Sequence, residues 1–184
     1  MPVYTPTLSE THSYCPDFSL HDVIHGKKIS LSDFKNGNPF VIMFICNHCP
    51  YVKAIEDRLI QLAIDLKEKA IHVVGICSND EFSYPEDSLE NLRIQALKKS
   101  YSFTYLHDRD QSVAKKFGAV CTPDFFVYDQ SGKLSYRGRL DDSWKDPTMV
   151  TTRELYLAVL EIAATKPISR IPTSSMGCSI KWLK

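Results

Sequence analysis

The chain has 184 residues, of which 43% are hydrophobic and 24% charged, and its 22 Lys and Arg residues balance 22 Asp and Glu residues. This length and composition fit one globular domain with a sizeable core and exclude a low-complexity or disordered chain. A zero formal net charge provides no basic face for nucleic acid and no polybasic surface for a membrane, so neither partner is expected.

The beginning of the sequence does not read as an export signal. Residues 1–18 have no basic start and no apolar run, and the longest apolar run, 40–46, is far too short to span a bilayer. Without export, the thiols are expected to be mostly reduced and the protein cytoplasmic. The cysteines are Cys15, Cys46, Cys49, Cys77, Cys121 and Cys178.

Hydrophobic periodicity and turn residues predict the elements in chain order. An irregular arm over 1–15 precedes a hairpin of two short strands within 17–34. There follow a buried strand over 40–46, a helix to about Lys69, a strand over 71–77, a helix over 85–100, a strand over 103–106, a short helix over 110–117, a hairpin of 124–129 and 133–138, and a helix over about 147–164.

This order of elements predicts a single α/β domain over 1–184, with a central mixed sheet flanked by helices on both faces. The remaining segment, 166–184, is polar and punctuated by proline, yet it ends in an apolar stretch that includes Trp182. Because an exposed Trp is costly, the tail is expected to dock on the domain.

The strongest chemical signal is Cys46-Asn47-His48-Cys49-Pro50, which joins a predicted buried strand to a predicted helix. Unpaired N–H groups at a helix N-terminus stabilise a thiolate, so Cys46 is expected to have a lowered pKa and to be the nucleophile. Cys49, one turn later, would resolve the mixed disulfide. His48 adds a donor or a positive charge near the sulfur, and Pro50 is tolerated in a first helical turn.

Other readings of the pair stay open. The two cysteines can be small apolar residues in a packed corner, and the domain can then be a redox-inactive binding module. A structural zinc site needs four ligands, and the sequence has no second CxxC or HxxxH. Soft thiolates also suit copper(I), so a copper or zinc carrier is a further alternative. No metal ligand set and no other cofactor are predicted.

A second signal, Val120-Cys121-Thr122-Pro123-Asp124, makes a family comparison specific. The chain resembles the thioredoxin-like superfamily and, within it, the redoxin branch that includes AhpC/TSA-like proteins. The blocks that carry this resemblance, besides the one around Pro123, are CPDFSLHDVIHGKKISLSDFKNGNPFVIMFICNHCP, YPEDS, YLHDRDQSVAKKFGAVCTPDFFVYD, YRGRLDDS and the terminal GCSIKW. The resemblance covers roughly Cys15 to Trp182. It implies a thioredoxin-like fold with an N-terminal hairpin extension.

The resemblance also implies that Pro123 is a cis proline facing the CxxC pair, so that the Thr122 backbone can pair with an extended disulfide substrate. An ordinary trans proline opening an edge strand is the alternative. The buried acid that thioredoxins carry on the strand before the pair is missing here. The proton acceptor for Cys49 is therefore unassigned, with Glu56, His48 and a water as candidates.

A thiol peroxidase is the alternative enzyme. Peroxiredoxins carry a Thr three residues before the peroxidatic Cys, and in this chain Cys46 takes that place relative to Cys49. Arg137 and Arg139 are candidates to orient a peroxide, although an Arg in this hairpin pattern is more often a solvated residue.

Two more cysteines are candidate redox residues. Cys121 directly precedes Thr122 and should lie near the pair. Cys178, in the terminal GCSIKW, would reach Cys46, Cys49 or Cys121 if the tail docks over the site, and would then be a resolving or regulatory thiol. The alternative for Cys178 is a packed or idle thiol.

These observations predict a thiol-disulfide oxidoreductase whose electrons travel on its own sulfurs. Its substrate would be a protein or small-molecule disulfide, with peroxide as the alternative, and an unidentified reductant would recycle it.

Overall fold

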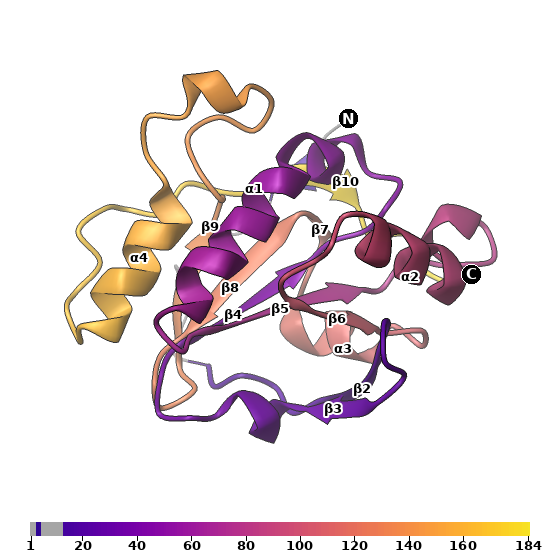
Figure 1. Ribbon diagram of the computed structural model, residues 1–184, viewed down its shortest axis with the longest axis horizontal. Coiled ribbons are helices and arrows are strands. Elements are labelled where there is room, and N and C mark those ends of the chain that lie inside the picture. Colours follow the sequence, from indigo (N-terminus) through magenta and orange to yellow (C-terminus); the bar gives the residue numbers. More distant parts are fainter. Residues whose placement is uncertain (1–2, 5–12) are drawn as a thin grey trace.

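The computed structural model describes residues 3–4 and 13–184. Its centre is a seven-stranded mixed sheet in the order β3-β2-β6-β5-β4-β8-β9 (Figure 1). Strands β4, β5 and β6 are parallel, and the other neighbouring pairs are antiparallel. The strands are β2 (Ser19–Asp22), β3 (Lys28–Ser30), β4 (Phe40–Phe44), β5 (His72–Cys77), β6 (Thr104–His107), β8 (Asp124–Tyr128) and β9 (Leu134–Gly138). The predicted mixed sheet is confirmed.

Helices cover both faces of this sheet, as predicted. Helices α1, α2 and α4 pack in the core on one face, and α3 packs with η1 in the core on the other. The helices are α1 (Pro50–Lys67), α2 (Leu89–Lys98), α3 (Ser112–Phe117) and α4 (Glu154–Ala163), with short 3-10 turns η1 (Leu31–Phe34), η2 (Pro85–Asp87) and η3 (Pro147–Met149). Within the described part of the chain, none of the helices has the length and apolarity to cross a bilayer.

The central strand β4 explains why its sequence is apolar throughout. Successive side chains of a strand point to opposite faces. Phe40, Ile42 and Phe44 therefore join the core beneath α3, while Val41 and Met43 join the core beneath α1. Both faces are covered, so a continuous hydrophobic run is favourable here, and the strand can end rigidly at the junction that carries the CxxC pair.

The N-terminal hairpin also forms as predicted. Strands β2 and β3 are antiparallel, and Gly26 takes a left-handed conformation with φ of +68° in the turn between them. Most of the predicted irregular arm, residues 1–2 and 5–12, lies outside the described residues. Of the rest, residues 3–4 form the short strand β1 (Val3–Tyr4), which differs from the prediction.

A small second sheet holds the C-terminal tail. Its order is β1-β10-β7, with β10 at Met176–Ser179 and β7 at Cys121–Thr122. Figure 1 shows β10, drawn in yellow, beside β7 and near the start of α1. Ile180, just after β10, is buried in the core on the α3 face. The end of the chain is thus placed next to the segment that contains Pro123.

Two predicted helices are interrupted. Residues 85–100 form η2 and then α2, because Ser88 is extended (ψ 151°) and its side chain caps α2 by accepting from the Asn91 amide. This break turns the Asp87 carboxylate inward, where it accepts a hydrogen bond from the Asn47 amide. The predicted helix over 147–164 is likewise divided into η3 and α4.

Candidate active site

The CxxC pair lies at the junction of β4 and α1, where the sequence placed it. Helix α1 begins at Pro50, and Cys49 is its N-cap residue with an extended backbone. Pro50 suits this first turn because its missing N–H would have no partner within the helix. The helix N-terminus therefore belongs to Cys49. Cys46 lies three residues earlier, in the turn after β4.

Cys46 is in a position that disfavours a thiolate. Its side chain is buried, and its Sγ lies 3.2 Å from the hydroxyl of Thr122. Burial raises the pKa of Cys46 well above the ordinary thiol value, and the neighbouring Cys49 and the negative charge of Asp87 raise it further. This direction is opposite to the lowered pKa expected at Cys46 from the sequence, and burial is its main cause.

Cys49 is the cysteine of the pair whose pKa is lowered, although its thiol also donates to the Thr122 carbonyl oxygen. The hydrogen bond from the Cys46 thiol lowers the pKa of Cys49 to about 5, against burial, and the backbone amides of Cys178 and Val52 lower it too. Val52 is the third residue of α1, so its N–H is one of the amides that the helix itself leaves unpaired. The electrostatic effect predicted for the first cysteine is found at the second.

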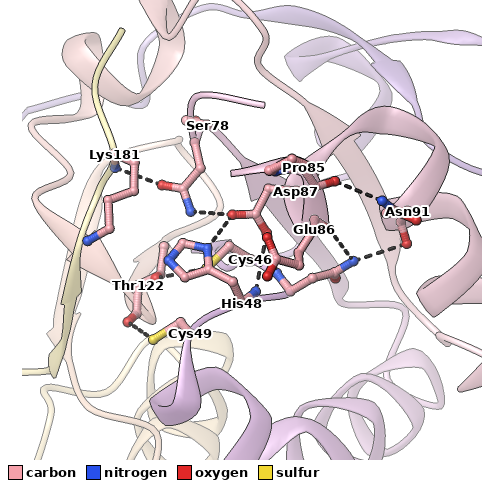
Figure 2. A network of polar contacts seen from close by, with 12 residues as sticks. Cys46, His48, Cys49, Ser78, Pro85, Glu86, Asp87, Asn91, Thr122 and Lys181 are labelled. Atoms are coloured by element: carbon pink, nitrogen blue, oxygen red, sulfur yellow. Dashed lines mark hydrogen bonds and ion pairs between the residues drawn. The ribbon is translucent and has the colours of Figure 1, made fainter. Parts of the chain in front are cut away.

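Both sulfurs face the residue before a cis proline. The peptide bond between Thr122 and Pro123 is cis, as the family resemblance implied. The Cys49 thiol donates to the Thr122 carbonyl oxygen at 3.1 Å, while the Thr122 hydroxyl contacts Cys46 (Figure 2). Thr122 is itself buried. One residue thus holds both thiols from the side opposite α1.

A buried carboxylate, Asp87, organises the turn between the two cysteines. It accepts from the backbone amides of Asn47 (2.7 Å) and His48 (3.3 Å), from the His48 ring through Nδ1, and from the Asn79 side chain (2.8 Å) (Figure 2). Burial disfavours the charge on Asp87, but the hydrogen bonds from His48 and Asn79 outweigh it and lower its pKa. Sequence reasoning missed this residue, and its signal was only its place in YPEDS.

His48 is held between an acid and an aromatic ring. Its ring stacks on Tyr84, with centroids 5.0 Å apart and planes 22° apart. Among the residues that the structure describes, its buried Nε2 has no hydrogen-bond partner. Asn47 anchors the same turn, because its side-chain amide donates to the carbonyl oxygens of Glu86 and Asn91, each at 3.0 Å. The roles of Asn47 and His48 in shaping the site therefore have a geometric basis.

Three of these side chains also form a cluster that could hold a metal ion. One ligand atom each from Cys46, His48 and Asp87 lie within 4.8 Å of one another. The sequence predicted no metal ligand set, because it has no second CxxC and no HxxxH. Its carboxylate already accepts four hydrogen bonds within the protein, so its oxygens have partners without an ion.

Glu56, a candidate proton acceptor for the pair, is engaged elsewhere. Its carboxylate accepts from the Gln95 amide at 2.7 Å and the Tyr101 hydroxyl at 2.6 Å, and it forms an ion pair with Lys99 at 3.3 Å. His48, the other side chain considered as a proton acceptor for Cys49, has a ligand atom within 4.8 Å of the Cys46 sulfur.

The two arginines considered as peroxide ligands are held by carboxylates. Arg137 is buried and contacts Asp124 at 2.7 Å, so the expectation of a solvated hairpin residue is wrong for it. Arg139 pairs with Glu154 at 2.6 Å. Both guanidinium groups therefore form ion pairs, Arg137 within the hairpin and Arg139 with α4.

The additional cysteines differ in their relation to the pair. Cys121 is buried opposite Ser179, with its thiol 3.5 Å from the Pro123 carbonyl oxygen, and burial raises its pKa. Cys178 lies directly opposite Thr122 in the β10–β7 pairing. Its thiol is hydrogen-bonded to Cys49, and burial and this contact raise its pKa to about 11. The structure thus brings Cys178, more than Cys121, to the CxxC pair.

Known structures resemble this chain over its whole length. An uncharacterized conserved protein from Geobacillus kaustophilus is 40% identical with a TM-score of 0.94, covering 100% of this chain and 97% of the other. A hypothetical protein from Sinorhizobium meliloti 1021 is 35% identical with a TM-score of 0.91, covering 98% and 97%. The thioredoxin domain of a thiol-disulfide oxidoreductase from Bacteroides vulgatus, at 19% identity, covers 69% of this chain and 86% of its own and shares the fold with a TM-score of 0.59.

The sequence pattern of the AhpC/TSA family matches residues 12–137. Comparison with curated proteins gave no match. The matched region contains the N-terminal hairpin, the CxxC pair and the cis proline, and the thioredoxin-like fold is shared with the solved structures. The chain therefore belongs to the AhpC/TSA family, in the redoxin branch of the thioredoxin-like superfamily.

Proposed function

We propose that the protein is a thiol-disulfide oxidoreductase that works through Cys46 and Cys49. The observation that carries this proposal is the contact between two free thiols at the start of α1, of which one is stabilised as a thiolate. A thiolate is the nucleophile in disulfide exchange, and a second thiol beside it can complete the exchange without leaving the protein.

In the proposed reaction, the Cys49 thiolate attacks one sulfur of a disulfide. The substrate S–S bond breaks, a mixed disulfide forms on Cys49, and the other substrate sulfur leaves and takes up a proton. Cys46 then attacks the Cys49 sulfur, so that a Cys46–Cys49 disulfide forms and the second substrate thiol is released. This assignment reverses the two roles expected from the sequence, because the stabilised charge is on Cys49.

Cys46 must lose its proton in the second step, and its raised pKa makes a nearby base necessary. We assign this role to His48, whose ring is fixed by Asp87 through Nδ1. The buried Nε2 of this ring has no hydrogen-bond partner among the described residues, so it is the atom that would take the proton, and the Asp87 carboxylate holds the ring through Nδ1. His48 and Asp87 thus replace the buried acid that thioredoxins carry on the preceding strand.

The proposal is tested by equilibrating the protein with glutathione buffers of increasing potential and mapping its disulfides by mass spectrometry. The wild-type protein should form a Cys46–Cys49 disulfide in a two-electron transition, and Cys46→Ala and Cys49→Ala should abolish it. The control is Cys77→Ser, a buried thiol at the end of β5. A pair that stays reduced in the most oxidising buffer contradicts the proposal.

The alternative activities give different results in the same preparation. A thiol peroxidase would consume hydrogen peroxide with a thiol reductant, and its reactive thiol would be oxidised by peroxide much faster than free cysteine. A carrier would purify with stoichiometric zinc or copper and lose it on Cys46→Ser. The cytoplasmic location and the unidentified reductant stay predictions.

A further inference from the structure

The C-terminal strand β10 occupies the edge of β7 beside the CxxC pair. Cys178 is paired with Thr122, and Ser179 with Cys121, in an antiparallel register. An extended segment that adds to this edge is positioned by its backbone, whatever its sequence, and each second side chain then points to the same side. In this protein the added segment is the C-terminal strand β10 of the same chain, and it places the Cys178 side chain beside the CxxC sulfurs.

The fit between β10 and the cis proline segment is close. A Cβ atom on Gly177 would come within 2.0 Å of the Thr122 carbonyl oxygen and 3.0 Å of the Pro123 nitrogen. A real Cβ never approaches a backbone oxygen so closely, so only glycine allows β10 to lie against this peptide. The next residue is Cys178. Gly177 therefore fixes the depth at which the Cys178 sulfur enters the site.

The tail is also anchored beyond the strand. The Ile180 amide donates to the Val120 carbonyl at 3.1 Å, the Lys181 amide to the Asn79 side chain at 2.9 Å, and the Gln111 side chain to the Lys181 carbonyl at 2.8 Å. With β10 in place, Cys46 is 2% exposed and Cys49 0%. Cys178 is less buried than either, so it is the most exposed of the three cysteines.

We propose that Cys178 is a third redox residue of this site, which attacks a mixed disulfide on Cys49 and forms a Cys49–Cys178 disulfide within the chain. This inference rests on the proposed disulfide exchange. The bond between Cys49 and the substrate sulfur breaks, the bond between Cys49 and Cys178 forms, and the substrate leaves as a thiol with the proton that Cys178 gives up. A low-molecular-weight disulfide is thereby reduced to two thiols while two protein thiols are oxidised.

The electrostatics of the site order these steps. Burial and the contact with Cys49 hold Cys178 protonated while Cys49 is a thiolate. When Cys49 enters a mixed disulfide it no longer carries a charge, so the second of these causes disappears and Cys178 loses its proton more easily. Cys46 can then attack the Cys49–Cys178 disulfide, form the Cys46–Cys49 disulfide and return Cys178 to a thiol.

The test uses Cys46→Ser, which blocks the competing reaction, treated with limiting oxidised glutathione and digested without reduction for mass spectrometry. A Cys49–Cys178 link is expected as the main product, and it should be replaced by a glutathione adduct on Cys49 in Cys46→Ser/Cys178→Ser. The matched control is Cys46→Ser/Cys15→Ser, which removes a buried thiol from the core on the α3 face. It should form the Cys49–Cys178 link as Cys46→Ser does.

The outcomes separate this inference from the proposed function. If wild type forms the Cys46–Cys49 disulfide but Cys46→Ser keeps glutathione on Cys49 with a free Cys178 thiol, the third redox residue is disproved and the exchange activity stands. If no cysteine is oxidised in either protein, both proposals fail.

A second variant tests the geometry. In Cys46→Ser/Gly177→Ala the added Cβ should move β10 away from Thr122, and the Cys49–Cys178 link should form about tenfold more slowly, as for a change of ~1.4 kcal/mol in the positioning equilibrium. Cys46→Ser/Ser179→Ala changes the residue that follows Cys178 in β10 and should form the Cys49–Cys178 link at the same rate as Cys46→Ser. An unchanged rate in the Gly177→Ala protein would show that β10 does not position Cys178.

Discussion

The charge on the Cys49 sulfur depends on the groups that surround it. The Cys46 thiol donates to it, and the Val52 and Cys178 amides stabilise it further. Burial raises the pKa of Cys46, and the contact with Cys49 and the negative charge of Asp87 raise it further. Two chemically identical side chains thus acquire opposite tendencies to ionise, which is the arrangement that disulfide exchange needs.

Removing the donor on Cys46 should raise the pKa of Cys49. The hydrogen bond from Cys46 lowers the pKa of Cys49 to about 5, so the wild-type protein should carry the thiolate at neutral pH. Cys46→Ala loses the hydrogen bond, so the midpoint should move up toward the ordinary thiol value of about 8.5. Cys46→Ser retains a hydroxyl donor and should move it less. The measurement is the ultraviolet absorbance of the thiolate against pH, and equal midpoints in the two variants would contradict the assignment.

Asp87→Asn should destabilise the fold, because an amide cannot accept all four hydrogen bonds made to the buried carboxylate. We expect a loss of about 2–3 kcal/mol in the free energy of unfolding at neutral pH. The folded pKa of Asp87 is lowered from 3.8, so its contribution is complete above that pH and is lost as the pH falls through the folded value. The difference from wild type, measured by urea unfolding, should therefore shrink in acid.

Glu86→Gln is the matched control for this comparison, since Glu86 is the exposed neighbour of Asp87. It should change the unfolding free energy by less than about 0.5 kcal/mol. A difference between Asp87→Asn and wild type that stays constant through the acid range would show that the carboxylate charge is not what stabilises the turn.

At the scale of elements, the break between η2 and α2 is what places Asp87 beside the CxxC turn. Ser88 is extended and caps α2, and this departure from helical geometry turns Asp87 toward the CxxC turn. The apolar spacing of 85–100 is compatible with one continuous helix. The tertiary hydrogen bonds to Asp87 decide against it.

Ser88→Ala should therefore weaken α2 at its start. The loss of an N-cap hydrogen bond costs about 1 kcal/mol, which we expect to see in urea unfolding. Ser88→Thr keeps the hydroxyl and should restore most of that stability. Hydrogen exchange at the Asn91 amide provides a local check, because this amide donates to Ser88. Unchanged exchange in Ser88→Ala would mean that the cap contributes nothing.

At the scale of the whole molecule, a buried ion pair links the two strands of the β8–β9 hairpin, and its Arg137 also bonds to the end of α3. Arg137 on β9 contacts Asp124 on β8, and it also donates to the Gly118 carbonyl at the end of α3 at 2.9 Å. Asp124 directly follows Pro123, so this pair supports the same segment that faces the sulfurs. Both charges are removed from water, and each therefore depends on the other.

Asp124→Asn should leave the Arg137 charge buried without its partner and lower the free energy of unfolding by about 3 kcal/mol. The double variant Asp124→Asn/Arg137→Met removes both charges and should recover part of this loss. Glu154→Gln, which breaks the more exposed pair with Arg139, should cost about 1 kcal/mol or less. Urea unfolding of the four proteins checks this order, and a double variant less stable than Asp124→Asn would contradict it.

The sequence alone determined the elements whose pattern is local. The apolar run at 40–46 and the repeat of Ile55, Leu59 and Leu62 specify β4 and α1, and the CxxC pair then lies at their junction, since strand and helix periodicities depend on neighbouring residues only. The family resemblance added the cis bond before Pro123. These predictions needed no knowledge of which distant segments meet.

Only the tertiary structure decided which residues surround the two sulfurs and in which direction these residues shift each pKa. Asp87 and Cys178 are far from the CxxC pair in sequence, yet a broken helix and a returning strand bring them to it. The one-turn shift of the helix start from Cys46 to Cys49 then moved the stabilised charge to the second cysteine. Electrostatic effects on a buried group fall off over a few ångströms of space, not along the chain, so no sequence pattern could assign them.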